Sequence, residues 1–143
     1  MKHIHRVKIY YEDTDCGGVV YYANYLRYWE RARTELFESG GTRLKELMDQ
    51  GYFFVVAEAF LKYLAPGRYG DILIVETSVE KAGAASIVFG HAVVREGTGE
   101  RLVEGTVRLG YVDRNMRPAR LGRDVIESLS RYAGDPLVKD GAQ

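Results

Sequence analysis

Two carboxylates and two glycines stand close together near the start of the chain. Asp13 and Asp15 are two residues apart, and Gly17 and Gly18 follow almost at once. A carboxylate beside bare backbone can act as a general base for water or attack a carbonyl carbon as a nucleophile. The same residues also suit a plain turn, because Asp and Gly are both common in turns.

The residues after the glycines predict a long helix that begins near Tyr21 or Tyr22. The first N–H groups of a helix have no intrahelical acceptor and carry a partial positive charge. A carbonyl oxygen that points at them is stabilised as it gains negative charge, as in an oxyanion hole. We therefore expect a carboxylate and a backbone donor along one turn, an arrangement that can activate water next to a polarised carbonyl group.

Glu58 and His91 are the other candidates inside predicted strands. Glu58 interrupts an apolar run, and we interpret it as sharing an outward face with Lys62, with a second catalytic carboxylate as the alternative. His91 stands between Phe89 and Val93, and we interpret it as a packed or interface residue rather than a catalytic one. Neither residue changes the assignment of the first turn as the main candidate site.

Further polar residues lie in the C-terminal half. Ser86 begins a predicted strand after a run of small residues, where a ligand could approach the backbone and Lys81 could supply charge; a plain turn explains the same composition. Four arginines follow the last predicted strand and suit either a solvated tail or a phosphate clamp: Arg114, Arg117, Arg120 and Arg123.

Several classes of function are excluded or disfavoured. Twenty basic and twenty acidic residues cancel, so the chain lacks the basic footprint of a nucleic-acid binder. The spacing of its histidines, carboxylates and Cys16 suggests no metal site, and no phosphate-binding glycine motif is present, so we expect no metal and no cofactor. We see no signal peptide and no transmembrane run. The single cysteine suits a reducing compartment, and we expect a cytoplasmic protein.

The hydrophobic pattern predicts one domain over residues 1–133 and a polar tail over 134–143. An apolar stripe on the long helix needs a sheet to cover it, so we predict an α+β domain with an antiparallel sheet wrapped around that helix. Such a sheet leaves edges that dimerisation would bury. The expected elements are strands over 4–11, 53–64, 71–81, 86–95 and 101–112, and helices over 22–39, 42–50 and 122–132.

The residues resemble a known family. Asp13-Thr14-Asp15, Gly18-Val19-Val20 and Asn24-Tyr25 are similar to the signature of the 4-hydroxybenzoyl-CoA thioesterases. The wider stretch 11–37 is closer to the YbgC-like acyl-CoA thioesterases, which accompany the Tol-Pal envelope system, and the similarity covers about residues 4–113. The resemblance implies a hotdog fold, with the long helix as the sausage in a bun of sheet, and an acyl-CoA substrate.

The resemblance also implies roles for single residues. Asp15 would be the general base or nucleophile, and the Tyr22 backbone N–H would polarise the thioester carbonyl. Many YbgC-like sequences have His at the position of Tyr22; a backbone donor survives that change, so we assign no role to the side chain. Substrate contacts would come from Gly17, Gly18, Val19 and, toward the CoA moiety, Ser86.

Active sites of this family lie between subunits, which implies a homodimer or homotetramer. Two alternatives stay open on the same fold. One is a non-catalytic module that binds acyl-CoA or an acyl carrier protein. The other is a dehydratase, which is disfavoured because no histidine stands beside the acidic turn or the helix start.

Overall fold

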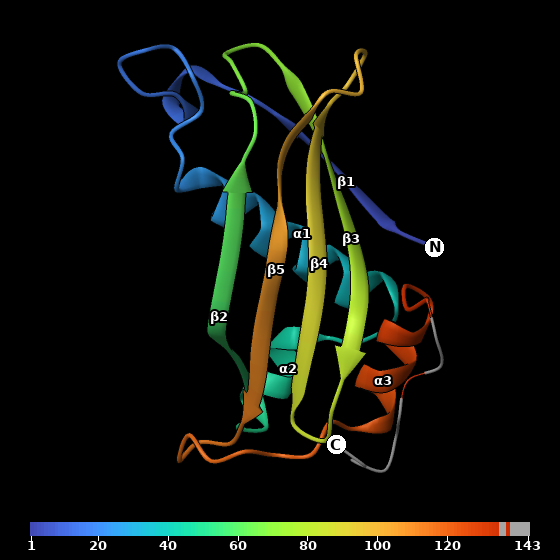
Figure 1. Cartoon of the computed structure of the whole chain (residues 1–143). Coiled ribbons are helices and arrows are strands. Elements are labelled where there is room, and N and C mark those ends of the chain that lie inside the picture. Colours follow the sequence, from blue (N-terminus) through green and yellow to red (C-terminus); the bar gives the residue numbers. More distant parts are fainter. Residues whose placement is uncertain (135–136, 138–143) are drawn as a thin grey trace.

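A five-stranded antiparallel sheet wraps around one long helix in the computed structural model, which describes residues 1–134 and 137 (Figure 1). The strand order is β1-β3-β4-β5-β2, and every neighbouring pair is antiparallel. The predicted α+β arrangement is therefore confirmed. The strands are β1 (His3–Lys8), β2 (Phe53–Tyr63), β3 (Ile72–Ala82), β4 (Ser86–Arg95) and β5 (Arg101–Val112).

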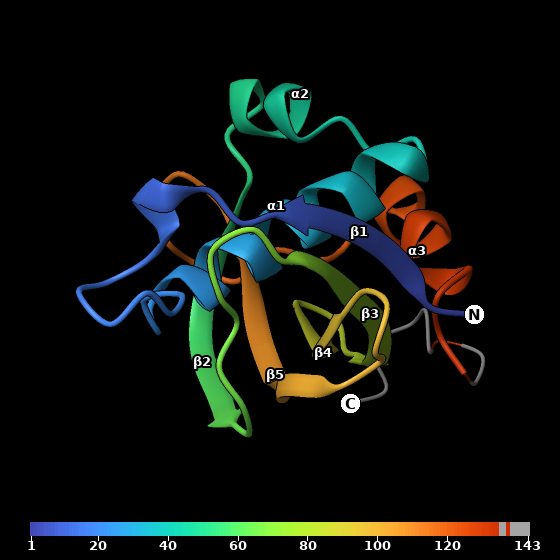
Figure 2. The same cartoon turned by 90° about the horizontal axis from the view of Figure 1, so that it is seen from above.

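The long helix α1 (Asn24–Ser39) crosses the inner face of the curved sheet (Figure 2). Its stripe at three- and four-residue spacing is buried, with Trp29, Ala32 and Leu36 fully enclosed. The sheet meets it with alternate residues of each strand, such as Leu73 and Val75 of β3. Two shorter helices complete the fold: α2 (Leu44–Asp49) and α3 (Arg123–Ser130), which packs beside α1.

The predicted boundaries need two corrections near the candidate turn. The first strand ends at Lys8, and Tyr11–Asp13 form a 3-10 helix, η1, because the Asp13 carboxylate accepts the Tyr10 N–H at 2.8 Å. The long helix begins at Asn24 rather than near Tyr21 or Tyr22. The backbone stays extended longer because the Val20 N–H donates to the Gly67 carbonyl at 2.8 Å.

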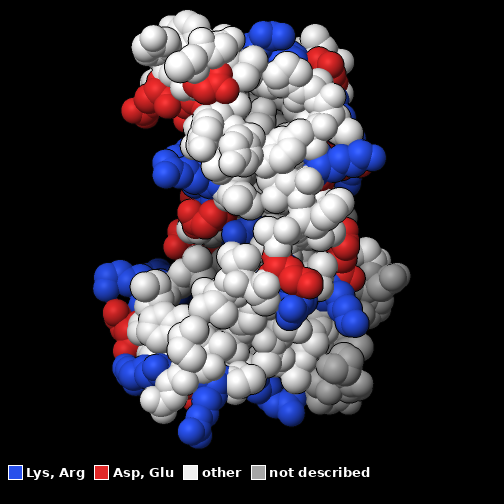
Figure 3. Space-filling view, turned by 60° about the vertical axis from the view of Figure 1, so that its left-hand side comes forward, with Lys and Arg blue, Asp and Glu red and all other residues white. Residues whose placement is uncertain are grey.

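The edge strand β2 presents apolar side chains to solvent. Val56 is 59% exposed and Phe60 is 64% exposed, although the strand is eleven residues long. Figure 3 views the side of the molecule that carries β2, where uncharged side chains form a continuous band between groups of charge. Strands of this length and character invite pairing with another strand.

The predicted tail over 134–143 falls almost wholly outside the described residues. Buried side chains from the sheet, α1 and α3 form one continuous core. None of the helices in the described part of the chain is long and apolar enough to cross a membrane.

Candidate active site

The Asp15 turn is held by its own backbone. The Asp15 N–H donates to the Val19 carbonyl at 2.9 Å, and the Gly18 N–H donates to the Asp15 carbonyl at 3.1 Å. Gly18 has a φ of 77°, a conformation that glycine adopts without strain. The Gly17 N–H donates to Oδ1 of Asp15 at 2.8 Å, which fixes the direction of the carboxylate. Asp15 is exposed, so its second oxygen is accessible to a ligand.

Asp13 is used differently from Asp15. Its carboxylate accepts the Tyr10 N–H, and its carbonyl accepts both the Tyr21 N–H at 2.9 Å and the Asn24 side-chain amide at 2.9 Å. Asp13 therefore anchors the loop to the start of α1. Asp15 is the carboxylate of this turn that remains available for chemistry.

Tyr22 lies in the turn that precedes α1. The Asn24 N–H donates to the Tyr21 carbonyl at 2.9 Å, which closes this turn, and none of the described residues accepts the Tyr22 N–H. The Tyr22 carbonyl accepts the hydroxyl of Tyr63 at 3.2 Å. The backbone donor is thus free, although it stands before the helix rather than in its first turn as the sequence predicts.

A second segment, residues 66–71, supports this turn. The Gly67 carbonyl accepts the Val20 N–H, and the Gly67 N–H donates to the hydroxyl of Tyr25 at 3.1 Å. Arg95 then fixes the segment by donating to the Pro66 carbonyl at 3.0 Å and by pairing with Asp71. The loop that carries Asp15 is therefore attached to both the sheet and α1.

Ser86 lies far from Asp15 in the same chain. It is opposite Gly110 on β5, which is opposite Val55 near the start of β2. Tyr22, by contrast, contacts Tyr63 at the end of β2. The stretch of β2 from Val55 to Tyr63 spans roughly 26 Å, so one chain does not bring Ser86 to the Asp15 turn.

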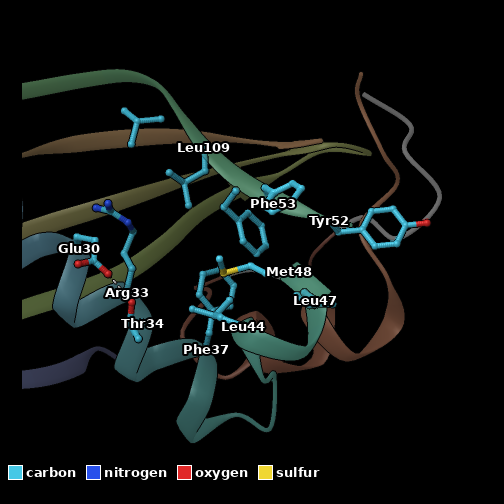
Figure 4. A pocket seen from close by; sticks show the side chains of 12 residues that line it. Glu30, Arg33, Thr34, Phe37, Leu44, Leu47, Met48, Tyr52, Phe53 and Leu109 are labelled. Atoms are coloured by element: carbon cyan, nitrogen blue, oxygen red, sulfur yellow. Dashed lines mark hydrogen bonds between the residues drawn. The ribbon is translucent and has the colours of Figure 1, made fainter. Parts of the chain in front are cut away.

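A cavity of about 260 Å³ lies between α1, α2 and the start of β2 (Figure 4). Its walls are mainly apolar, and its polar end is formed by Glu30, Arg33 and Thr34. Sequence reasoning missed this cavity because its walls come from four separate segments. The apolar members are Phe37, Leu44, Leu47, Met48, Phe53, Phe54, Val56 and Leu109, with Tyr52 at the far end.

Arg33 and His91 form a buried polar pair beside this cavity. Arg33 is only 6% exposed, and its Nη1 lies 3.2 Å from Nε2 of His91. The other ring nitrogen, Nδ1, lies 3.0 Å from the hydroxyl of Thr77. Burial, and then the charge of Arg33, lower the pKa of His91 well below its usual value. His91 is therefore packed and neutral, and it stacks on Trp29 with ring centroids 4.6 Å apart.

The remaining candidates lie outside the turn. Glu58 faces outward and accepts Nε of Arg108 at 3.2 Å, as the alternation predicts. Cys16 is exposed and free. The four C-terminal arginines are exposed, and Arg114 donates to the Asp49 carbonyl at 3.2 Å. The described residues include no cluster of metal-ligating side chains.

The central helix and the sheet wrapped around it define a hotdog-type domain, and the candidate acidic turn lies just before that helix. The chain belongs to the thioesterase superfamily, whose family model matches residues 17–101. This confirms the family and the fold that the sequence resemblance implies.

Two curated relatives are similar over most of their length. The acyl-CoA thioester hydrolase YbgC of Escherichia coli O6:H1 is 38% identical over 122 residues, covering 84% of this chain and 90% of the relative. The acyl-CoA thioesterase YbgC of Haemophilus influenzae is 38% identical over 121 residues, covering 83% and 88%. Among solved structures, a DHNA-CoA thioesterase from Staphylococcus aureus is 27% identical with a TM-score of 0.84, covering 91% of this chain and 89% of that one.

Proposed function

We propose that this protein hydrolyses the thioester of an acyl-CoA to a free acid and CoA, without a metal or bound cofactor. One observation carries the proposal: the exposed carboxylate of Asp15 shares a loop with the Tyr22 N–H, which none of the described residues accepts. Relatives named as acyl-CoA thioesterases supply the substrate class. The exposed loop leaves room for a thioester carbonyl between the two groups.

In the proposed reaction, water adds to the thioester carbonyl carbon while Asp15 takes up one of its protons. The carbonyl oxygen becomes an oxyanion and accepts the Tyr22 N–H. Collapse of this intermediate breaks the C–S bond, and the departing sulfur takes a proton, giving CoA thiol and the acid. Alternatively, Asp15 attacks first and forms a mixed anhydride, which water then hydrolyses. Gly17, Gly18 and Val19 line the approach of the substrate in either route.

The working form in this proposal is a homodimer, or a tetramer built from two such dimers. β2 is an edge strand, and pairing it with β2 of a second copy continues the sheet and buries Val56 and Phe60. A two-fold axis makes that pairing antiparallel, because each copy must present the same surface to the other. No other exposed strand of the described chain is as long and apolar as β2.

Antiparallel pairing also explains the distance between Ser86 and Asp15. It places the Tyr63 end of one β2 beside the Phe53 end of the other. The turn with Asp15 and Tyr22 of one subunit then faces two features of the second subunit. One is the cavity, and the other is the start of β4, which carries Ser86. A substrate could therefore meet the base from one chain and CoA contacts, Ser86 among them, from the other. CoA esters and the single Cys16 both suit the cytoplasm, where we place the protein.

A thiol-release assay over short, long and aromatic acyl-CoAs tests this function. We expect steady release of CoA from at least one class, with turnover that is unaffected by a metal chelator. The rival function is a non-catalytic module that binds acyl-CoA or acyl carrier protein. Binding of CoA esters without release from any of them would support that rival and overturn the hydrolase.

A further inference from the structure

The buried guanidinium of Arg33 has charge and hydrogen-bonding capacity that the protein does not use. Arg33 lines the cavity from α1, and Figure 4 shows its side chain rising toward the sheet at one end. Its hydrogen bond within the described chain goes to His91, through Nη1. A guanidinium carries five N–H donors, so most of the donors of Arg33 have no acceptor among the described residues.

His91 cannot neutralise that charge. Because arginine only donates, Nε2 of His91 must be the acceptor, and Nδ1 then carries the proton and donates to the Thr77 hydroxyl. A second positive charge on this ring would lie 3.2 Å from the guanidinium. The pair therefore holds one positive charge and a neutral imidazole that fixes one edge of the guanidinium.

No carboxylate of the described chain forms an ion pair with Arg33, although the charge of Glu30 acts on it from the same end of the cavity. Arg33 takes part in none of the ion pairs that the described residues form. Glu30 also lines the cavity, but it is exposed, and Oε2 accepts the Thr34 hydroxyl at 2.6 Å. Burial lowers the pKa of Arg33 to about 10, which still leaves it charged at neutral pH. Glu30 offsets only part of the cost of burying this charge, because the net effect is still a lowered pKa, so a buried guanidinium with unused donors favours an anionic ligand.

The rest of the cavity is apolar. Phe37, Leu44, Met48 and Phe53 surround its middle in Figure 4. Its volume of about 260 Å³ is roughly nine times the volume of one water molecule in the liquid. Such a space accepts a hydrocarbon chain of moderate length, and it rejects a ligand that is polar along its whole length.

We propose that this cavity binds acyl groups that end in a carboxylate, with the hydrocarbon chain against the apolar walls and the terminal carboxylate on Arg33. The planar guanidinium matches a carboxylate through two parallel hydrogen bonds, which a lysine could not form. Arg33 would thus determine specificity, and His91 and Thr77 would hold it in position. The inference rests on the proposed function, since the thioester end of the bound acyl-CoA must reach the Asp15 turn of the second subunit.

The experiment compares matched CoA thioesters of equal chain length, one ending in a methyl group and the other in a carboxylate. We expect the wild-type protein to favour the carboxylate ester by about tenfold or more in kcat/KM. Arg33→Met should remove this preference, because the loss in kcat/KM on the carboxylate ester should exceed any loss on the methyl ester by about tenfold or more. Arg33→Lys should recover only part of the preference. Lysine keeps the charge but cannot form the two parallel hydrogen bonds of a guanidinium.

Arg27→Met is the matched control, because Arg27 is an exposed arginine on the same helix. It should leave the preference unchanged, and thermal unfolding with sedimentation should show that every variant is folded and assembled. A wild-type preference for the methyl ester, or an equal loss on both esters in Arg33→Met, would overturn the inference. The second result would mean that Arg33 serves the reaction or the fold instead.

Failure of the proposed function gives a different result, namely no hydrolysis of any ester. In that case calorimetric binding of the same two esters decides the inference by itself. The carboxylate ester should then bind more tightly than the methyl ester to the wild-type protein, and Arg33→Met should abolish the difference. Equal binding of the two esters would refute it.

Discussion

Tyr25 and Tyr28 pack edge to face on α1, with ring centroids 5.9 Å apart, but their hydroxyl groups are in different situations. The Tyr25 hydroxyl accepts the Gly67 N–H at 3.1 Å and so attaches α1 to the segment that holds the Asp15 loop. The Tyr28 hydroxyl is buried and makes no hydrogen bond of normal geometry within the described residues, but burial and then the nearby Asp13 carboxylate raise its pKa. Removing each hydroxyl should therefore have a different effect.

Tyr25→Phe should lower the free energy of unfolding by about 1–3 kcal/mol, because it leaves the buried Gly67 N–H without an acceptor. Tyr28→Phe removes a hydroxyl that makes no hydrogen bond of normal geometry and has only the nearby Asp13 carboxylate beside it, so it should destabilise the protein less than Tyr25→Phe does. Urea denaturation of the two variants measures both effects. Equal destabilisation by the two substitutions would contradict this account of the loop.

Asp15→Asn should keep the fold and assembly but reduce kcat by at least about a hundredfold, the lower end for loss of a general base. Steady-state kinetics on any acyl-CoA that the wild-type protein hydrolyses would measure the loss. Glu12→Gln is the control, because Glu12 is an exposed carboxylate in the same region. Near-normal turnover in Asp15→Asn would remove Asp15 from the mechanism.

A mixture of two inactive variants tests the shared active site. Asp15→Asn and Ser86→Lys should each be inactive, the second because a long charged side chain blocks the CoA contact. When both chains are co-expressed, about a quarter of the wild-type sites should return, since half of the dimers are mixed and each has one intact site. The specific activity of the purified mixture is the readout. No recovery would place Asp15 and Ser86 in separate functions.

The exposed edge of β2 should be required for assembly. Phe60→Glu places a charge on the apolar strand and should convert the protein to monomers, with loss of turnover. Ile4→Lys is the matched control, because Ile4 is an exposed apolar residue on β1, at the opposite edge of the sheet. Sedimentation equilibrium compares the two variants. A Phe60→Glu protein that keeps the wild-type mass would show that subunits meet elsewhere.

Stability should fall in mild acid because of His91. The pKa of His91 is lowered in the folded protein, first by burial and then by Arg33, so below about pH 6.5 the unfolded chain binds a proton that the folded chain does not. The free energy of unfolding should then decrease as the pH is lowered, by up to about 1.4 kcal/mol per pH unit. His91→Gln should flatten this dependence, as measured by denaturation from pH 7 to pH 5. His3, whose pKa burial also lowers, should add to the slope in the same direction.

Much of the fold could be predicted because its signals are local. Apolar residues alternate along β3, and those of α1 recur at helical spacing, so both elements are evident from neighbouring residues. The start of α1 was predicted two or three residues too early because the competing interaction is remote. Val20 pairs with Gly67, and that contact keeps the backbone extended past the glycines.

The candidate site was only partly predictable for the same reason. Asp15 and Tyr22 belong to one continuous motif, whereas Arg33 and His91 meet across 58 residues of sequence. One local sign of burial was available: Arg33 stands four residues after Trp29 and four before Phe37, on the apolar stripe of α1. The separation of Ser86 from Asp15 depends on sheet topology, which no local pattern encodes.

The strand order has a consequence for the order in which the protein folds. β3, β4 and β5 are joined by short turns and can form a meander early, because each pairing closes only a small loop. β1 pairs with β3 and β2 pairs with β5 across much longer stretches of chain, so these pairings should form late. The ribosome therefore releases the Asp15 loop and α1 before any of the meander on which α1 must pack. In the proposed dimer, catalytic competence should be the last property to arise, after the sheet has closed and the second copy has paired.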